Sequence, residues 1–258
     1  MVGKSRSGLA NDRRAYGCDR ICATTPICSS LTTISLADIA TFGVYGQFNN
    51  IEGWLLNGNT TLMVCDVLEI PAGQTLLPNG FTLTNNGTIN VRGELRNTTE
   101  GFDAFNYISI TINNGTINVF PTGSITVSVE IYGNAATFTN NGVLNNNGYI
   151  FCQTFGVINN TSGGRINNNS ADVGGIGGFR LNSEGTFNNS GVFINNTGAT
   201  SYNASGATIY NYGGGLITNN GDITNAGDIF TGNSICGFGT INGTGSFSGN
   251  ITVVGCPP

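Results

Sequence analysis

One phrase of the sequence recurs, and its pattern decides the fold. Residues 81–91 read FTLTNNGTINV, and residues 110–119 repeat this pattern as ITINNGTINV. Shorter versions follow at residues 138–145 (FTNNGVLN), 186–193 (TFNNSGVF) and 216–223 (LITNNGDI). Apolar and polar residues alternate around the Asn-Asn-Gly units, which is typical of half-buried β-strands. The sequence therefore predicts a repeat built from short strands.

Strands of this length are not stable alone in water, so they need neighbours. Stacking one coil on the next, at about 4.8 Å, completes the backbone hydrogen bonds and encloses a core. Asn-Gly is also a hairpin signal, so an antiparallel meander is the competing arrangement. The first two Asn-Asn-Gly gaps, from residue 85 to 113 and on to 140, favour coiling because hairpins give no reason for so long a period. We predict an all-β fold, a single-stranded parallel β-solenoid (β-helix) with an irregular N-terminal cap.

The Asn-Asn-Gly units are predicted to form the corners of the coils. Gly and Asn accept positive φ at little steric cost, and Asn side chains at equivalent corners can form amide ladders. We expect a structural role for these residues, and we predict no catalytic residue, cofactor or metal site. The predicted structural corners are Asn85, Asn86, Gly87, Asn113, Asn114, Gly115, Asn140, Asn141, Gly142, Asn219, Asn220 and Gly221.

The apolar pattern conflicts with this alignment at one strand. When the Asn-Asn-Gly units are aligned, Thr82 and Thr84 fall opposite Ile110 and Ile112. A one-residue slip of this kind moves a strand's side chains to the opposite face. We expect corner lengths to vary, so that Ile110 and Ile112 point inward like the other apolar residues.

The repeated phrase LTNNGTIN, residues 83–90, resembles those of parallel β-helix or β-solenoid repeat proteins with NNGT-type units. Such repeats occur in surface, fibre and capsid-associated proteins of bacteria, phages and large DNA viruses. The resemblance covers about residues 70 to 256 and implies an architecture. It implies no single function, since these solenoids serve as spikes, adhesins, capsid components and, in some families, polysaccharide-cleaving enzymes.

Three zones are predicted along the chain: a basic Cys-containing arm (1–30), an N-terminal cap (31–70) and the β-solenoid (71–258). The arm holds five of the nine basic side chains. In the cap, Ser35 and Asp38 resemble a capping box that opens a short helix. A first coil exposes an apolar end and unpaired backbone groups, which the cap is expected to cover.

The seven cysteines leave at least one without an intramolecular partner. Cys18, Cys22 and Cys28 lie close together in the arm. Without histidine or a tight CxxC pair, their spacing favours a local disulfide or an inter-chain link over a zinc site.

Composition narrows the classes of function. The chain has no histidine, one lysine and a charged fraction of only 9%. Because Lys and Arg dominate contacts to phosphate, we predict no nucleic-acid partner. No apolar run is long enough for a membrane span.

Several chemical readings compete with a purely structural one. Asp222 and Asp228 are six residues apart and are candidates for a carboxylate pair of a glycan-cleaving enzyme, but a solvated surface role is the simpler interpretation. Calcium binding at residues 172–178 is rejected because the Gly-rich stretch lacks a repeated Asp. Tyr202, Tyr210 and Tyr212 are candidates for stacking on sugars, against a plain role as half-buried strand residues.

We therefore predict a non-enzymatic structural protein of an extracellular or virion-surface assembly, located on a virion or cell exterior. Its partners would be protein subunits of the same assembly, and we expect a homo-oligomer. A glycan- or receptor-binding spike or adhesin is the alternative, with a surface glycan as ligand. A β-helical polysaccharide-cleaving enzyme ranks third.

Overall fold

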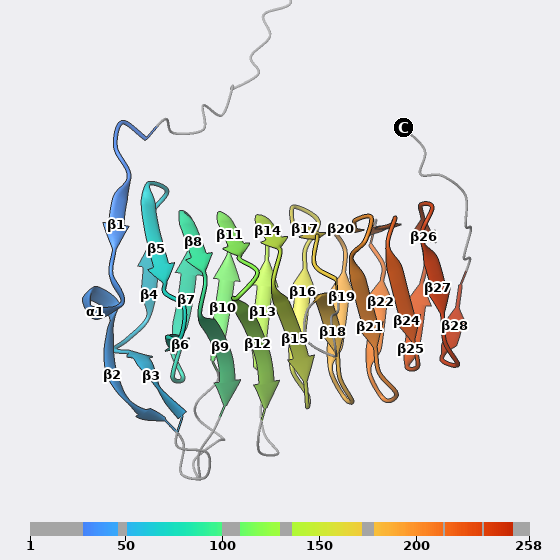
Figure 1. Cartoon of the computed structure of the whole chain (residues 1–258), viewed down its shortest axis with the longest axis horizontal. Coiled ribbons are helices and arrows are strands. Elements are labelled where there is room, and N and C mark those ends of the chain that lie inside the picture. Colours follow the sequence, from blue (N-terminus) through green and yellow to red (C-terminus); the bar gives the residue numbers. More distant parts are fainter. Residues whose placement is uncertain are drawn as a thin grey trace, which may run out of the picture.

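The strands stack side by side along a rod, in the computed structural model that describes residues 28–45, 51–99, 109–129, 136–171, 178–213, 215–233 and 235–249 (Figure 1). Successive strands pass through three sheets in turn, so each sheet receives every third strand. Nearly all pairings are parallel between neighbouring coils, as for Ile110 with Thr82 and with Thr137. The predicted all-β parallel solenoid is confirmed.

Three long sheets form the walls of the solenoid, and we call them sheets A, B and C. Sheet A contains β1 (Thr32–Ile34), β5 (Asp66–Ile70), β8 (Thr88–Val91), β11 (Thr116–Val119), β14 (Val143–Asn146), β17 (Arg165–Asn168), β20 (Val192–Asn195), β23 (Leu216–Asn219) and β26 (Ile235–Cys236). Sheet B contains β2 (Ala40–Tyr45), β3 (Ile51–Leu56), β6 (Thr75–Leu77), β9 (Glu94–Thr99), β12 (Ser124–Val129), β15 (Tyr149–Gln153), β18 (Gly178–Leu181), β21 (Thr200–Asn203), β24 (Asp222–Asn225) and β27 (Thr240–Asn242). Sheet C contains β4 (Thr60–Leu62), β7 (Thr82–Asn85), β10 (Ile110–Asn113), β13 (Thr137–Asn140), β16 (Val157–Asn160), β19 (Thr186–Asn189), β22 (Thr208–Asn211), β25 (Asp228–Thr231) and β28 (Ser246–Ser248).

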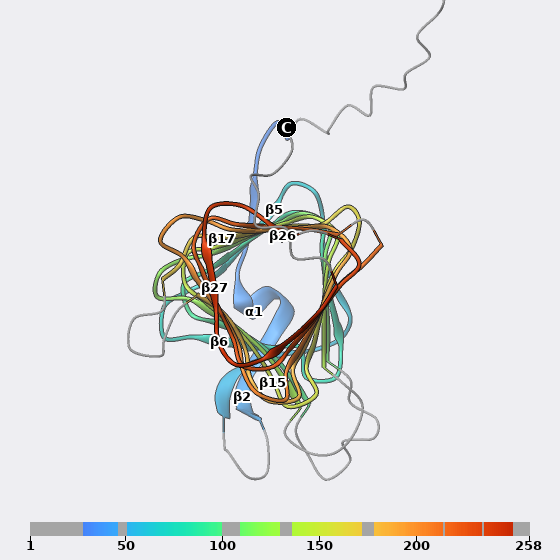
Figure 2. The same cartoon turned by 90° about the vertical axis from the view of Figure 1, so that its right-hand side faces the viewer.

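The N-terminal end of the rod is closed by a short helix and an antiparallel strand pair. Helix α1 (Leu36–Ile39) begins after Ser35, whose hydroxyl and backbone N–H both donate to the Asp38 carboxylate. These bonds lower the pKa of Asp38 from its ordinary value. Leu36 is buried in the apolar core, and Figure 2 shows α1 behind the opening that the three sheets enclose. The Ser35–Asp38 helix start predicted from the sequence is therefore present.

Parallel stacking reaches further towards the N-terminus than the predicted solenoid. Strands β4 and β5 pair in parallel with β7 and β8, and β1 pairs in parallel with β5. The segment predicted as a cap thus supplies strands of the first coils as well as the helix. Only β2 runs antiparallel to its neighbour β3 among the pairs of described strands.

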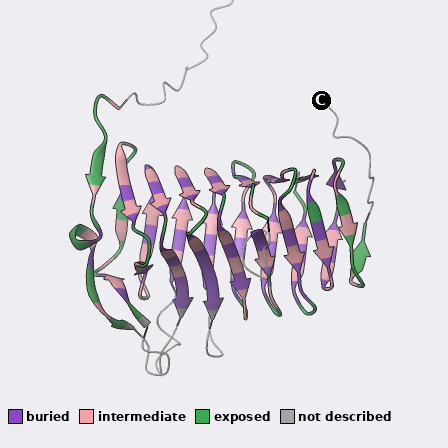
Figure 3. Ribbon diagram, viewed as in Figure 1, coloured by how far each residue is buried: buried purple, intermediate pink, exposed green. Residues whose placement is uncertain are grey.

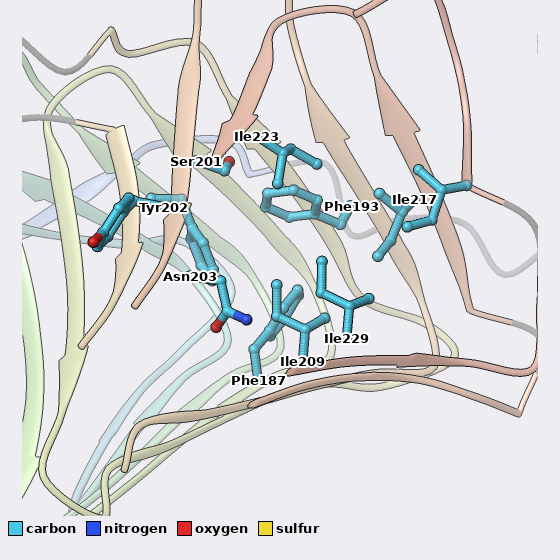
Figure 4. Close-up of a pocket in the computed structure, with 11 residues that line it drawn as sticks. Phe187, Phe193, Ser201, Tyr202, Asn203, Ile209, Ile217, Ile223 and Ile229 are labelled. Atoms are coloured by element: carbon cyan, nitrogen blue, oxygen red, sulfur yellow. The ribbon is translucent and has the colours of Figure 1, made fainter. Parts of the chain in front are cut away.

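The core fills the centre of the solenoid with one inward row after another of Leu, Ile, Val and Phe (Figure 3). Phe179, Phe187 and Phe193 pack against one another with ring centroids 5.0–5.4 Å apart. The cavity beside them, shown in Figure 4, has a volume of about 10 Å³, close to that of one water molecule. This part of the interior is therefore packed and has no room for a small-molecule ligand.

The register of β10 corrects one sequence-based expectation. Asn113 pairs with Asn85 and Asn140, and this places Thr111, not Ile110 and Ile112, inside the core. Ile110 and Ile112 are half-buried on the outward face. The strands therefore pair as the Asn-Asn-Gly alignment predicts, with no change in corner length. As a result, the two isoleucines of β10 face outward.

Opposing free energies explain this outcome. Burying both isoleucines fully would gain at most about 1.5–3 kcal/mol each, and their half-burial already recovers part of that. A one-residue shift would remove Asn113 from its bonds to Asn85 and Asn140, at about 1–3 kcal/mol for each group left unsatisfied. It would also displace Gly115 from a corner that has no room for a side chain. The corner therefore sets the register.

Thr111 gives a direct test of this register. Its buried hydroxyl has no hydrogen-bond partner, and it lies between Leu83 and Phe138. Thr111→Val keeps the shape and removes the unsatisfied group, so we expect the free energy of unfolding to rise by about 1 kcal/mol. Thermal denaturation should show a Tm increase of about 2–4 °C. Thr139→Val, on the outward face of β13, should change stability by less than about 0.5 kcal/mol; destabilisation by Thr111→Val would contradict the register.

Candidate functional site

A row of buried asparagine side chains runs along the corner where the strands of sheet C end. Each amide Nδ2 donates to the Oδ1 of the next asparagine at 2.7–2.8 Å. We call this row the inner ladder; its members are Asn85, Asn113, Asn140, Asn160, Asn189 and Asn211, all buried. At its end, Asn211 donates to the Thr231 hydroxyl at 3.1 Å.

The remaining hydrogen-bonding groups of the inner ladder are also used. The second N–H of Asn85 donates to the backbone oxygen of Thr116 at 3.0 Å, and that of Asn113 donates to Val143 at 3.0 Å. The Oδ1 of Asn85 also accepts from the backbone N–H of Gly87 at 3.1 Å. Each side chain thus joins one strand end to the next coil and to the start of a strand in the next sheet. Buried amides are stabilising only when satisfied in this way.

Buried asparagines also bond between coils at the other two corners. At the end of the sheet A strands the ladder contains Asn146, Asn168, Asn195 and Asn219, with bonds of 2.8–2.9 Å. At the end of the sheet B strands, Asn203 donates to Asn225 at 2.8 Å. Asn219 therefore lies on a different corner from Asn85, Asn113 and Asn140, although the sequence motif is the same. Sequence alignment alone could not separate the corners because the motif is shared among them.

The second asparagine of each predicted unit lies outside the core. Asn141 donates to Asn114 at 2.8 Å, and Asn114 donates to Asn86 at 2.9 Å. Asn220, the second asparagine of the last predicted unit, accepts a hydrogen bond from the backbone N–H of Phe238 at 3.4 Å. These outer bonds are open to solvent or half-buried, so each is expected to contribute less than its buried neighbour.

The glycines of the predicted units are required because a side chain would not fit there. The sequence-based explanation, that these positions need a positive φ, is therefore wrong. None of Gly87, Gly115, Gly142 and Gly221 has a positive φ, and neither do the asparagines of these units. A Cβ on Gly142 would lie 2.2 Å from the oxygen of Gly115, and one on Gly115 would lie 2.1 Å from the oxygen of Gly87. The corners stack so closely that any side chain at this position meets the backbone of the previous coil.

A further row of amides crosses the outward face of sheet A and has a charge at each end. Arg165 Nε donates to Asn167 at 2.9 Å, and Asn90 donates to the Glu69 carboxylate at 2.6 Å. Between them the donors all point towards the N-terminus, along Asn167, Asn145, Asn118 and Asn90. The cation at the donor end and the carboxylate at the acceptor end match the direction of the aligned amide dipoles. The row joins five consecutive coils on their outer surface.

The predicted tyrosines are divided between two faces. Tyr202 lies on sheet B beneath the Arg180 guanidinium, 4.7 Å from its ring centroid, and Figure 4 shows its ring directed away from the apolar cluster. Tyr210 lies on sheet C, where it stacks on Phe230 at 5.3 Å and approaches Tyr212 at 5.9 Å. One face of the Tyr202 ring and one face of the Tyr210 ring are thus occupied by a protein neighbour.

The candidate carboxylates also lie on separate sheets. Asp222 begins β24 in sheet B and accepts from the Thr240 hydroxyl, whereas Asp228 begins β25 in sheet C and accepts from the Ser246 hydroxyl. Each therefore bonds to the following coil in its own sheet. Among the described residues there is no cluster of three or more groups that could hold a metal ion, and no described helix is long and apolar enough to cross a membrane.

Cys28 forms a disulfide that the sequence reading missed. Its partner is Cys65, 37 residues away, with the two Cα atoms 5.6 Å apart. The parallel pairing of β1 with β5 brings these cysteines together. The other two cysteines of the predicted cluster, Cys18 and Cys22, lie outside the described residues. Cys236 is also disulfide-bonded, whereas Cys152 is a free thiol whose burial raises its pKa to about 12.

The N-terminal end carries a groove that the sequence did not reveal. It has a volume of about 280 Å³ and lies between the cap and the first coils, lined mainly by apolar atoms of Ile34, Leu36, Ala37, Trp54 and Pro71. Gln74 accepts from Trp54 Nε1 at 2.9 Å and holds the indole at the groove wall. Its one carboxylate, Glu69, is already bonded to Asn90 and to Arg92.

Comparisons with known proteins do not identify a family for this chain. No protein family and no curated protein matches the chain. Among solved structures, the chain is similar to a hyper-glycosylated TibA fragment whose glycosylation is catalysed by TibC. The alignment covers 88% of this chain and 90% of that chain, with 17% sequence identity and a TM-score of 0.24. A likeness with so low a TM-score carries no argument about this chain.

The inner ladder predicts different costs for the two asparagines of one corner. Asn113→Ala removes two buried amide bonds and leaves groups of Asn85 and Asn140 unsatisfied, so we expect a loss of about 2–5 kcal/mol in the free energy of unfolding. Asn114→Ala, on the exposed face of the same corner, should cost less than about 1 kcal/mol. Chemical denaturation measures both. Equal effects would show that burial of the ladder does not matter.

The stacked corners predict that one added methyl group is severely destabilising at Gly142. We expect Gly142→Ala to lower stability by several kcal/mol, or to prevent folding, because its Cβ meets backbone atoms that cannot move aside. Gly58→Ala is the matched control, since a Cβ there has no atom within 4 Å and φ is not positive. Circular dichroism and thermal melts should separate the two variants clearly, and a folded Gly142→Ala of ordinary stability would contradict the packing.

Proposed function

We propose that the chain is a non-enzymatic structural subunit of an extracellular or virion-surface assembly. The inner ladder is the observation that carries this proposal. Its buried side-chain amides hydrogen-bond to one another and so join successive coils. A continuous row of satisfied amides makes a stiff rod with a defined length, which suits a part that projects or packs within a larger particle.

The disulfides support a location outside the cell. Cys28–Cys65 fastens the N-terminal end of the rod, and Cys236 is bonded near the other end. Such bonds form and persist in oxidising surroundings and are rare in the cytosol of most organisms. A virion or cell exterior meets this condition.

Glycan recognition is the second candidate, and Tyr210, Tyr212 and Phe230 are the residues that favour it. They form one aromatic group on sheet C, and Tyr212 is 46% exposed. A sugar would need an open ring face, and Tyr210 and Phe230 each give one face to the other. Cleavage of polysaccharides ranks below both candidates, because Asp222 and Asp228 bond along separate sheets.

Labelling of intact particles tests the structural proposal. Antibodies against the rod should bind the outside of intact virions or unpermeabilised cells of the source. The chain should be present in many copies per particle by quantitative mass spectrometry. Loss of labelling after mild detergent stripping of the surface would agree with this location. A chain found only in the soluble interior, or in a few copies, would overturn the structural role.

A further inference from the structure

The two ends of the rod hold most of its exposed apolar surface. Ten large hydrophobic side chains are exposed among the described residues, and only Phe155, Tyr212 and Leu216 lie on the sides. The other seven lie beside or within the first and last strands of the sheets: Leu31, Phe42, Val44, Met63 and Val64 at the N-terminal end, and Phe238 and Phe247 at the C-terminal end. Concentrated exposed apolar surface marks a contact site. We therefore expect a protein partner to bind at the ends of the rod and not at its sides.

Phe238 is the most exposed of these side chains. Its relative accessibility is 88%, and it lies in the connection between β26 and β27, the last strands of sheets A and B. Its backbone N–H is held by Asn220, so the ring stands on an anchored main chain. At the opposite end of the rod, the apolar groove beside Trp54 offers a recess for an aromatic ring.

We propose that copies of this chain associate head to tail, with Phe238 of one copy seated in the groove formed by Ile34, Leu36, Ala37, Trp54 and Pro71 of the next. The partner is a second copy of this chain. This inference rests on the proposed structural function and names its contact. Because the two surfaces differ, the contact is heterologous and repeats along the rod axis.

The other two pairings of ends leave an apolar surface uncovered. Two C-terminal ends would leave the groove empty, and two N-terminal ends would leave Phe238 exposed. A head-to-tail contact covers both surfaces.

The sheet edges also allow head-to-tail stacking. At the N-terminal end, β1 and β4 are edge strands and run parallel to the rest of sheets A and C. At the C-terminal end, β26 and β28 are the other edges of those two sheets. A head-to-tail neighbour therefore meets strands of the same direction in both sheets. Open edges of this kind are ready templates for pairing with another chain.

Two full-length variants test the contact from its two sides. Phe238→Ser removes the ring but keeps the groove, and Ala37→Trp fills the groove but keeps the ring; both positions are exposed, so folding should be unaffected. Sedimentation velocity should show wild-type protein forming end-to-end oligomers as concentration rises. Each variant should need about tenfold or more protein to associate. Leu216→Ser, on the side of the rod, should behave as wild type.

Mixing the variants distinguishes the head-to-tail contact from the alternatives. Ala37→Trp supplies a usable Phe238 and Phe238→Ser supplies a usable groove, so an equimolar mixture should form a discrete 1:1 dimer that grows no further. Normal association of Phe238→Ser alone would overturn the proposal, showing that the C-terminal end is covered by the chain itself or is unused. A monomeric wild type would also overturn it. The structural function would then still be judged by its own test, the labelling of intact particles.

Discussion

The hydrogen bonds between buried asparagine side chains of successive coils are the constraint on which the rest of the structure depends. Each amide between the two ends of the inner ladder is held by the coil before it and the coil after it, and its remaining N–H reaches the start of a strand in the adjacent sheet. No member can move by one residue without leaving several buried polar groups unsatisfied. The ladder therefore fixes the position of every sheet C strand between Asn85 and Asn211, and a glycine two or four residues after each member keeps the corners close enough to bond.

The ladder also explains how coils of unequal length form one regular rod. Consecutive members lie 28, 27, 20, 29 and 22 residues apart in the sequence. The stacked strands nevertheless stay in register, because each ladder bond joins the same strand end in successive coils. Polar side chains on the sides of the rod thus hydrogen-bond to one another along its axis. The row of amides from Arg165 to Glu69 is one example. What remains for contact with other molecules is concentrated at the two ends.

Much of this structure could be predicted from the sequence, and the failures have physical reasons. The recurring phrase is sufficient for an all-β parallel solenoid, because strands so short need stacked neighbours, and repeated Asn-Asn-Gly units indicate the amide ladders. The position of Asn219 could not be predicted, since three corners share one motif. Ile110 and Ile112 were expected inside because apolar alternation was given more weight than a buried amide. The glycine of the repeated unit was explained by backbone angle, whereas at Gly142 the distance to the previous coil is what excludes a side chain. The Cys28–Cys65 bond depends on β1 pairing with β5, which no local pattern reveals.

Thiol labelling of two cysteine variants in β10, Ile112→Cys and Thr111→Cys, tests most directly whether the asparagine ladder sets the register. The modified peptides are identified by mass spectrometry, so the natural cysteines do not interfere. If the ladder sets the register, Ile112→Cys reacts in the native protein, whereas Thr111→Cys reacts only after unfolding. Rapid native labelling at position 111 with protection at position 112 would mean that the apolar pattern sets the register and that Asn113 does not bond in the ladder.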